Sequence, residues 1–202
     1  MGLELADADG IEGLSMRKLA QSLGVEAMSL YHHVANKDAL LDAMVDVVFA
    51  EVVLPSADAP WQPEVRARCT SLREILVRHP WAVGQLNARR SPGMATLIHH
   101  DVMIGCLRAG GFSVRAAAHA FATLDAYVYG FAVQELSLPM EPGEDTADLA
   151  AEILASAPLD ALPHLAEMAA AYVGLPDYQF ANEFEPGLDL ILDALERTRR
   201  AG

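Results

Sequence analysis

The stretch from residue 15 to residue 38, SMRKLAQSLGVEAMSLYHHVANKD, constrains the fold of this chain more than any other segment. Ser15 is suited to cap a helix, because its hydroxyl oxygen can accept a hydrogen bond from a backbone N–H of the first turn. Apolar residues then follow at helical spacing, and the small side chain of Ala20 lets a second helix cross closely. Gly24 can adopt positive φ in a tight turn before that second helix. The pattern predicts a helix-turn-helix.

The second helix of this motif is expected from about Glu26 to His33, with Leu30 and Val34 facing inward. The other positions carry small, polar and aromatic groups of the kind that enter the major groove of DNA. Basic residues on the flanking helices are candidates for phosphate contacts. The predicted DNA-binding residues are Arg17, Lys18, Ala27, Met28, Ser29, Tyr31, His32, His33 and Lys37.

A third helix is expected to begin after Asn36, whose side chain can cap its first turn, and to continue to about Val53. Lys37 lies in that first turn. Its ammonium group and the free backbone N–H groups there are suited to contact one DNA phosphate.

Helix breakers between Val53 and Trp61 mark the predicted domain boundary. We expect a helix-turn-helix DNA-binding domain over residues 1–53 and a larger helical domain over residues 60–202. The sequence is 52% hydrophobic, which is enough for a core in each. The predicted fold class is therefore all-α. Helical patterns in the larger domain cover residues 61–78, 80–86, 94–108, 113–138, 146–156, 159–173 and 179–200.

The charge of the chain argues against strong binding to nucleic acid. The formal net charge is −14, and residues 1–50 hold three basic residues against eight acidic ones, a local net charge of −5. Proteins that bind DNA normally neutralise phosphates with Lys and Arg. The predicted DNA-binding domain is therefore electrostatically poor, and His32 and His33 would add positive charge only when protonated.

Three motifs in this order, MRKLAQSLGV, SLYHHV and NKDALLDAM, resemble the N-terminal domain of the TetR family of transcriptional regulators. Glu26 departs from that pattern, because a Ser or Thr is common there and an acid would lie close to the phosphates. Family members also carry basic residues ahead of and within the first helix, whereas residues 1–10 here contain none. We therefore expect either a basic arm outside this chain or weak DNA binding.

Three later motifs, HPWAVGQLNARRSPG, AGGFSVRAAAHAFATLDAYVYGFAVQE and FEPGLDLILDALE, are similar to the C-terminal domain of tetracycline-repressor-like members, which binds ligand and forms the dimer. The resemblance implies that the helices around Ser113–Leu138 and Gln179–Arg200 pair with those of a second copy as an intersubunit four-helix bundle. The residues agree independently, because two long helices have more apolar surface than one small domain needs. The alternative is that these helices form only the core of a monomer.

The resemblance also implies an effector cavity between the helices of the second domain. The candidate lining residues, each of which is equally suited to a packed core, are Trp81, Gln85, His99, His100, Met103, Phe121, Tyr127, Phe131 and Gln134. Tetracycline repressors hold a magnesium–drug chelate through a His and a Glu, and the matching positions here are Ala126 and Gln134. We therefore expect a different ligand, apolar or aromatic with modest polarity, and no obligatory metal.

Other classes of function have little support in the sequence. His99, His100 and Asp101 are adjacent, and adjacent helical residues point about 100° apart, so they cannot hold one ion together. The sequence has no nucleophile elbow, Gly-rich phosphate loop or CxxC pair. We expect no enzyme activity and no cofactor. Cys69 and Cys106 are isolated and are expected to be thiols rather than a disulfide.

The sequence also lacks an uninterrupted apolar run of about 18 residues and a secretory signal pattern, so we expect no membrane span and a cytoplasmic protein. Two hypotheses remain. The first is a homodimeric repressor with recognition helices in successive major grooves of a pseudo-palindromic operator, about 34 Å apart, that a small-molecule effector releases. The alternative is a helical small-molecule-binding protein of the same fold with weak or lost DNA binding.

Overall fold

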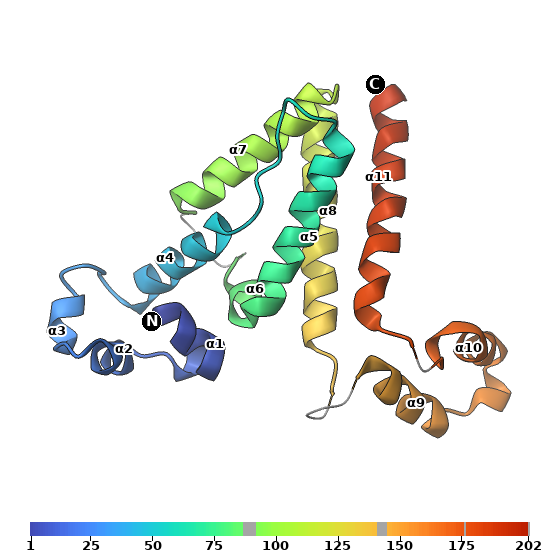
Figure 1. The fold of residues 1–202 in the computed structure, drawn as a ribbon, viewed down its shortest axis with the longest axis horizontal. Helices are drawn as coiled ribbons and strands as arrows, with labels where there is room; N and C mark the ends of the chain where they lie inside the picture. The colour runs from blue at the N-terminus through green and yellow to red at the C-terminus, as the bar shows by residue number, and fades with distance from the viewer. Residues whose placement is uncertain (87–91, 141–144, 176, 202) are drawn as a thin grey trace. The chain divides into compact units, whose positions relative to one another are not determined.

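The computed structural model describes residues 1–86, 92–140, 145–175 and 177–201. Every regular element in these ranges is helical, which confirms the predicted all-α class (Figure 1). Residues 87–91, the NARRS part of the motif HPWAVGQLNARRSPG, lie outside the described ranges. No helix within these ranges is both long and apolar enough to cross a membrane.

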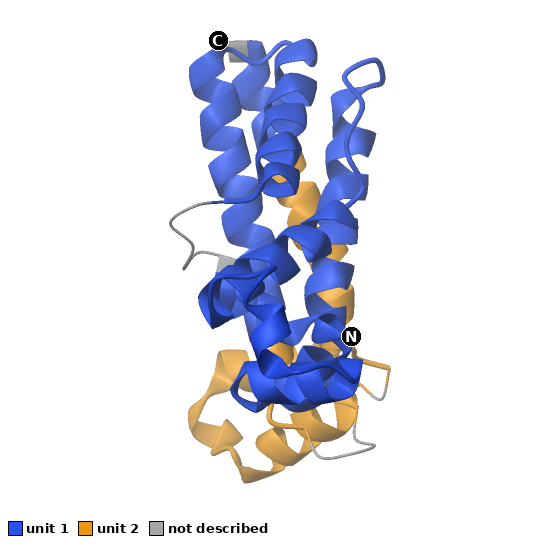
Figure 2. Cartoon of the chain, turned by 90° about the vertical axis from the view of Figure 1, so that its left-hand side faces the viewer, with its two compact units in different colours: residues 1–133, 194–202 blue, residues 134–193 orange. Residues whose placement is uncertain are grey.

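The chain divides into two compact units (Figure 2). The first contains residues 1–133 and 194–202, and the second contains residues 134–193. The first unit contains residues on both sides of the predicted domain boundary at residues 53–60. A compact unit need not be a functional domain, so this boundary stays a prediction.

The first unit begins with the helices of the predicted DNA-binding domain, which include the helix-turn-helix. They are α1 (Gly2–Gly13), α2 (Met16–Leu23), α3 (Ala27–Leu30) and α4 (Lys37–Ala50). Buried Leu19, Ala20 and Leu30 form a small core that joins α2 to α3, and half-buried apolar residues of α1 and α4 pack against it. This core fixes the crossing of the two helices.

Local chemistry sets the starts of α2 and α4. Ser15 Oγ accepts a hydrogen bond from the Lys18 N–H at 3.1 Å, and Asn36 Oδ1 accepts one from the Ala39 N–H at 2.8 Å. Gly24 adopts the left-handed conformation, with φ of 68°, after the last residue of α2. Both predicted caps and the predicted glycine turn are confirmed.

The helix α3 is shorter than predicted, because it ends at Leu30 rather than His33. The Leu30 carbonyl accepts hydrogen bonds from the N–H groups of both His33 and Val34, at 2.9 and 3.0 Å, which closes a turn over residues 31–33. Tyr, His and Val have modest helix propensity, and Asn36 starts the next helix soon afterwards. The recognition element is therefore one helical turn followed by a tight turn.

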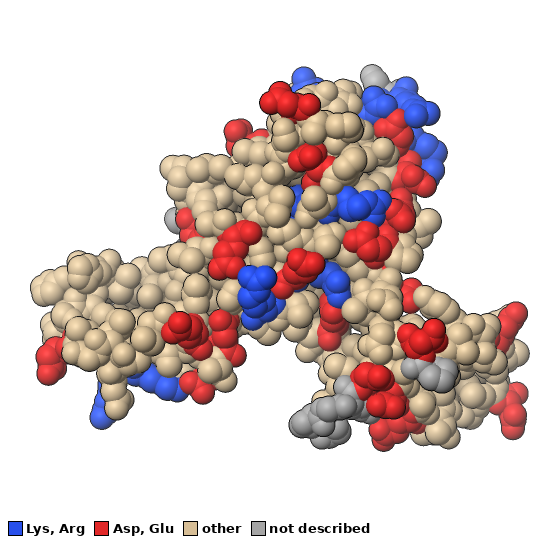
Figure 3. Space-filling model, in the orientation of Figure 1, with Lys and Arg blue, Asp and Glu red and all other residues tan. Residues whose placement is uncertain are grey.

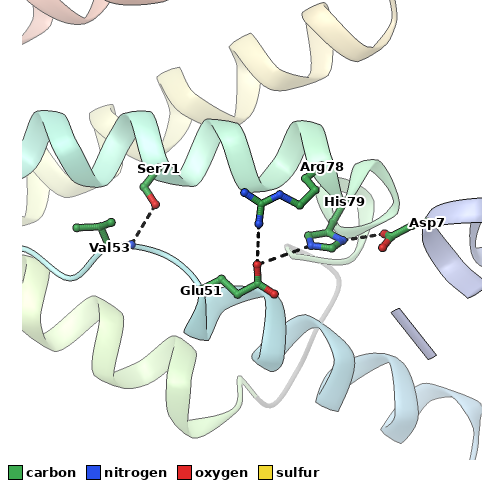
Figure 4. Close-up of polar contacts among 6 residues, drawn as sticks. All are labelled: Asp7, Glu51, Val53, Ser71, Arg78 and His79. Carbon is green, nitrogen blue, oxygen red and sulfur yellow. Dashed lines mark hydrogen bonds and ion pairs between the residues drawn. The ribbon is translucent and has the colours of Figure 1, made fainter. Parts of the chain in front are cut away.

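The helix α4 also ends early, at Ala50 rather than Val53. The Val53 N–H donates to Ser71 Oγ at 3.1 Å instead of to a carbonyl of its own helix (Figure 4). This bond to the following helix draws the chain out of the helical path, a long-range effect that the local pattern does not contain.

The remaining helices of the first unit agree with prediction to within two residues at each end. They are α5 (Trp61–Arg78), α6 (Pro80–Leu86), α7 (Met94–Ala109) and α8 (Val114–Leu136), whose last three residues belong to the second unit. Val65, Cys69 and Leu72 are fully buried on α5, and α5 and α4 both pack against α7.

The second unit contains the remaining helices, whose bounds follow the sequence less closely. They are α9 (Thr146–Ser156), the 3-10 helix η1 (Leu159–Ala161), α10 (Pro163–Met168), the π-helix η2 (Ala169–Val173), the 3-10 helix η3 (Phe180–Glu183) and most of α11 (Phe184–Ala201). The single helix expected over 159–173 is divided, because Pro163 forces Leu162 out of helical geometry (φ −128°, ψ 69°). Side chains from several helices of the second unit surround an apolar cavity of about 220 Å³.

Candidate DNA-binding surface and effector site

Met28 of the short helix α3 and the residues of the turn after it present their side chains to solvent. Met28 is 73% exposed and Tyr31 is 46% exposed, and His32 and His33 are also exposed. Ser29 Oγ donates to the Glu26 carbonyl at 2.8 Å. The protein thus displays a Met and aromatic edge on a buried helix-turn-helix core. Among the predicted contact residues on this helix, Ala27 and Ser29 are only half-buried rather than exposed, and Ala27 packs against that core.

Two of the three predicted phosphate contacts already have partners inside the N-terminal helices. Lys18 Nζ forms an ion pair with Asp9 Oδ2 at 2.5 Å, and Lys37 Nζ donates to the Ile11 carbonyl at 3.0 Å. The Lys37 bond joins the first turn of α4 to the last turn of α1. Arg17 is exposed. On the face drawn in Figure 3, Lys and Arg are few over α1–α3 and acidic side chains lie among them.

A second set of polar contacts joins α1 to the corner between α5 and α6. Asp7 Oδ1 lies 2.7 Å from His79 Nδ1 and accepts a hydrogen bond from Trp81 Nε1, also at 2.7 Å. Glu51, just after α4, pairs with Arg78 at 2.9 Å and lies 3.9 Å from His79 Nε2 (Figure 4). These contacts connect the helices at both ends of the helix-turn-helix to the body of the first unit.

Trp81 and Gln85, two of the predicted effector residues, lie at this junction and apart from the others. They line a cavity of about 520 Å³ together with residues of α1, among them Asp7, Ile11 and Glu12. Trp81 is buried and its indole N–H is used by Asp7.

The centre of the first unit holds a buried polar cluster that the sequence analysis did not identify in full. Arg68 of α5 is completely buried, its Nη1 pairs with Asp125 Oδ1 of α8 at 2.6 Å, and its Nε donates to His99 Nε2 of α7 at 3.4 Å. The cluster thus links three helices. The signal for Arg68 was its position on the apolar face of the 61–78 pattern, three residues after Val65 and four before Leu72.

Burial and charge set the protonation of this cluster. Burial, followed by the charge of Arg68 and by His100, lowers the pKa of His99 to about 3. Burial opposes the charged form of Arg68, but the Asp125 carboxylate, together with Cys69 and Tyr129, more than compensates, and the net pKa of Arg68 is raised. Neutral His99 accepts at Nε2, so its proton is on Nδ1.

Two donors of the cluster remain unused. Arg68 Nη2 and His99 Nδ1 are both buried, and neither has a hydrogen-bond partner among the residues that the structure describes. Buried polar groups are nearly always satisfied, so two such atoms in one cluster indicate a place where polar atoms of a bound molecule or water belong.

Most of the other predicted effector residues lie on α7 and α8, the helices that carry His99 and Asp125. Met103 is fully buried, and the rings of His100 and Phe121 meet edge to face at 5.0 Å between centroids, joining α7 to α8. Tyr127 and Phe131 are 6.0 Å apart, and the Arg73 guanidinium lies 5.3 Å from the Phe131 ring centre. Gln134 belongs to the second compact unit.

Two family descriptions match the chain. Residues 2–44 match "Bacterial regulatory proteins, tetR family", and residues 54–199 match "Tetracyclin repressor-like, C-terminal domain". A transcriptional regulator of Saccharopolyspora erythraea with a helix-turn-helix is 40% identical over 129 residues, 63% of this chain and 55% of that protein. The chain thus aligns with about half the length of this curated relative.

Other relatives cover nearly the whole chain. The class A tetracycline repressor of Escherichia coli is 32% identical over 98% of this chain and 88% of its own length. The crystal structure of the Streptomyces coelicolor TetR family protein ActR in complex with actinorhodin superposes with a TM-score of 0.79 at 30% identity, over 98% of this chain and 94% of ActR. These matches confirm the resemblance seen in the sequence motifs: the chain belongs to the tetR family of bacterial regulatory proteins and carries a tetracyclin repressor-like C-terminal domain.

Proposed function

We propose that this protein is a ligand-responsive DNA-binding transcriptional regulator, a homodimeric repressor that a small-molecule effector releases from a pseudo-palindromic operator. The observation that carries the proposal is the exposed edge formed by α3 and the turn after it, where Met28 and Tyr31 project from a helix-turn-helix with its own buried core. A helix presented in this way enters a major groove, and two copies related by a two-fold axis read two half-sites. Such a regulator acts in the cytoplasm and needs no catalytic residue.

The effector site is proposed to include the buried cluster of Arg68, His99 and Asp125. The two unused donors, Arg68 Nη2 and His99 Nδ1, favour a ligand that presents oxygen acceptors such as carboxylate, phenolate or carbonyl groups. Met103 and Phe121 supply apolar and aromatic surroundings for the rest of the molecule. The relative ActR was crystallised in complex with the small molecule actinorhodin, which supports a small-molecule ligand for this protein as well.

The experiment that tests the function is selection of bound duplexes from a random DNA pool by the purified protein, followed by mobility-shift titrations at several salt concentrations. We expect one enriched pseudo-palindromic sequence, bound by the dimer with an affinity that falls as salt rises. A screen of small aromatics that carry carboxylate, phenolate or carbonyl groups should then find compounds that release this duplex. Failure to enrich any sequence at low salt would remove the proposal.

One observation favours a second candidate, a small-molecule-binding protein without DNA affinity. Residues 1–50 have a net charge of −5, and Lys18 and Lys37 are engaged inside the N-terminal helices. This alternative predicts ligand binding by calorimetry with no enriched duplex, and Tyr31→Ala would then leave every measured property unchanged. Under the repressor hypothesis, Tyr31→Ala weakens the shift of the selected duplex.

A further inference from the structure

A carboxylate of α4 holds the first turn of α7. Asp46 Oδ2 accepts a hydrogen bond from the Ala95 N–H at 3.1 Å, and Asp46 Oδ1 accepts from the Thr96 N–H at 3.0 Å and from Thr96 Oγ1 at 3.1 Å. The N–H groups of a first turn have no partner within their own helix, and the helix dipole favours a negative charge there. Asp46 therefore caps α7 from a different helix.

The sequence leaves room for this contact at Gly93, which precedes α7. A Cβ atom at this position would lie 2.3 Å from Asp46 Cγ and 2.5 Å from each carboxylate oxygen, far inside van der Waals contact. The backbone at Gly93 is extended (φ −74°, ψ 174°), a conformation open to any residue. The glycine is therefore required by the approach of α4 and not by the backbone angles.

The same two helices meet again one turn further along, next to the proposed effector site. Phe49 lies three residues after Asp46 on one face of α4, and its ring meets the His99 ring edge to face at 5.6 Å. His99 in turn accepts from Arg68. A ligand that accepts hydrogen bonds from Arg68 Nη2 and His99 Nδ1 would thus act on α7 one turn after the first turn that Asp46 holds.

We infer that the Asp46 contact with the first turn of α7 is the positioning contact through which the effector site controls DNA binding. This inference rests on the proposed function. α4 follows the recognition turn directly, and Lys37 at its start joins it to α1, so the direction of α4 sets the orientation of the helix-turn-helix. With the contact intact, α7 holds α4 in one orientation. Movement of α7 breaks the contact and frees that orientation.

Two variants break the contact from opposite sides. Asp46→Asn keeps the shape but removes the charge and turns one acceptor into a donor that faces a backbone N–H. Gly93→Ala introduces the Cβ clash from the α7 side. Asp101→Asn is the control for the lost charge, because Asp101 is exposed on α7, the helix that Asp46 contacts. Gly105→Ala is the matched control for the added methyl group, because a Cβ there meets nothing within 4 Å.

Two measurements are needed for each full-length protein, at a temperature where all variants are folded. Hydrogen exchange at the Ala95 and Thr96 amides reports whether the contact is broken. Fluorescence anisotropy reports affinity for the duplex that the wild-type protein selects and for a random duplex of equal length. We expect faster exchange in Asp46→Asn and Gly93→Ala, affinity for the selected duplex about tenfold weaker, and affinity for random DNA unchanged. Both controls should match the wild type.

The readout separates positioning from mere stability, since a loss of folded protein would weaken both duplexes equally. If exchange at the two amides is faster and the selected duplex still binds as tightly as to the wild type, the inference is overturned while the proposed function stands. Unchanged exchange in both variants overturns it as well, because the contact then holds nothing. If the wild type selects no duplex, the proposed function itself has failed.

Discussion

Arg68 is a charged side chain in the centre of an apolar helical body, and its buried charge is compensated by the Asp125 carboxylate. A buried ion pair contributes little net stability, but removal of one partner leaves the other charge without compensation. The pairing explains why a completely buried guanidinium is tolerated between α5 and α8.

Replacement of Arg68 alone should therefore be costly. We expect Arg68→Met to lower the free energy of unfolding by about 3–5 kcal/mol, because the Asp125 carboxylate loses its partner. The double variant Arg68→Met with Asp125→Leu should recover most of that loss. Urea denaturation of the three proteins at pH 7 checks this, and a double variant as unstable as the single one would contradict it.

His99 makes stability depend on pH in a defined window. Its pKa is about 3 in the folded protein against an ordinary value of 6.5, so the unfolded chain binds the extra proton between these values. Stability from this group is therefore complete above pH 6.5 and is lost as the pH falls toward 3. Between pH 7 and pH 5 the loss amounts to about 2 kcal/mol.

The variant His99→Gln isolates this effect, since it keeps an acceptor for Arg68 but does not titrate. The difference in unfolding free energy between pH 7 and pH 5 should be smaller in the variant by about 2 kcal/mol. Urea titrations of both proteins at the two pH values measure it. Equal pH dependence in the two proteins would mean that His99 is not buried in its neutral form.

The contacts of individual side chains were the feature least predictable from the sequence. The resemblance to tetracycline-repressor-like members made His99 and Met103 candidates, whereas the partners of Arg68 are 31 and 57 residues away in the chain and were not predicted. Trp81 was grouped with the effector residues, but its indole binds Asp7, 74 residues earlier. Helical periodicity predicts which face of a helix is buried, and contacts between distant helices decide what that face meets.

Individual elements were predictable where their ends are fixed locally. The caps at Ser15 and Asn36 and the turn at Gly24 involve atoms within a few residues, and all three are confirmed. The end of α4 depends on Ser71, in the next helix, and was placed three residues too late. Helix starts with a polar cap are thus better predicted than helix ends that tertiary contacts determine.

The Asn36 cap itself should contribute measurably to the N-terminal helices. Asn36→Ala removes the acceptor for the Ala39 N–H and should destabilise the protein by about 1 kcal/mol. Asn36→Asp restores an acceptor and should keep the wild-type stability. Thermal unfolding of the three proteins checks this, and equal loss in the Ala and Asp variants would show that the side chain acts in another way.

For the molecule as a whole, family membership could be predicted from the motifs, but charge and partners could not be judged from composition alone. The count of three basic residues in the first 50 overstates what is available to DNA, because Lys18 is paired with Asp9 and Lys37 is bound to the Ile11 carbonyl. DNA affinity of a homodimer should therefore be weak for its size and only moderately sensitive to salt.

One substitution should strengthen this weak DNA binding. Asp9→Asn removes an acidic charge and also frees Lys18 Nζ, so binding to the selected duplex should become tighter, and the slope of log affinity against log salt should steepen by about 2 for a dimer. Glu12→Gln removes the same charge from the same helix, from an exposed residue, without releasing Lys18.

Mobility-shift titrations from low to moderate salt measure both effects. Glu12→Gln should tighten binding only slightly, with an unchanged slope, because no new cation reaches a phosphate. If the two variants behave alike, Lys18 does not contact DNA, and Arg17 together with the backbone N–H groups of the helix starts must supply the phosphate contacts.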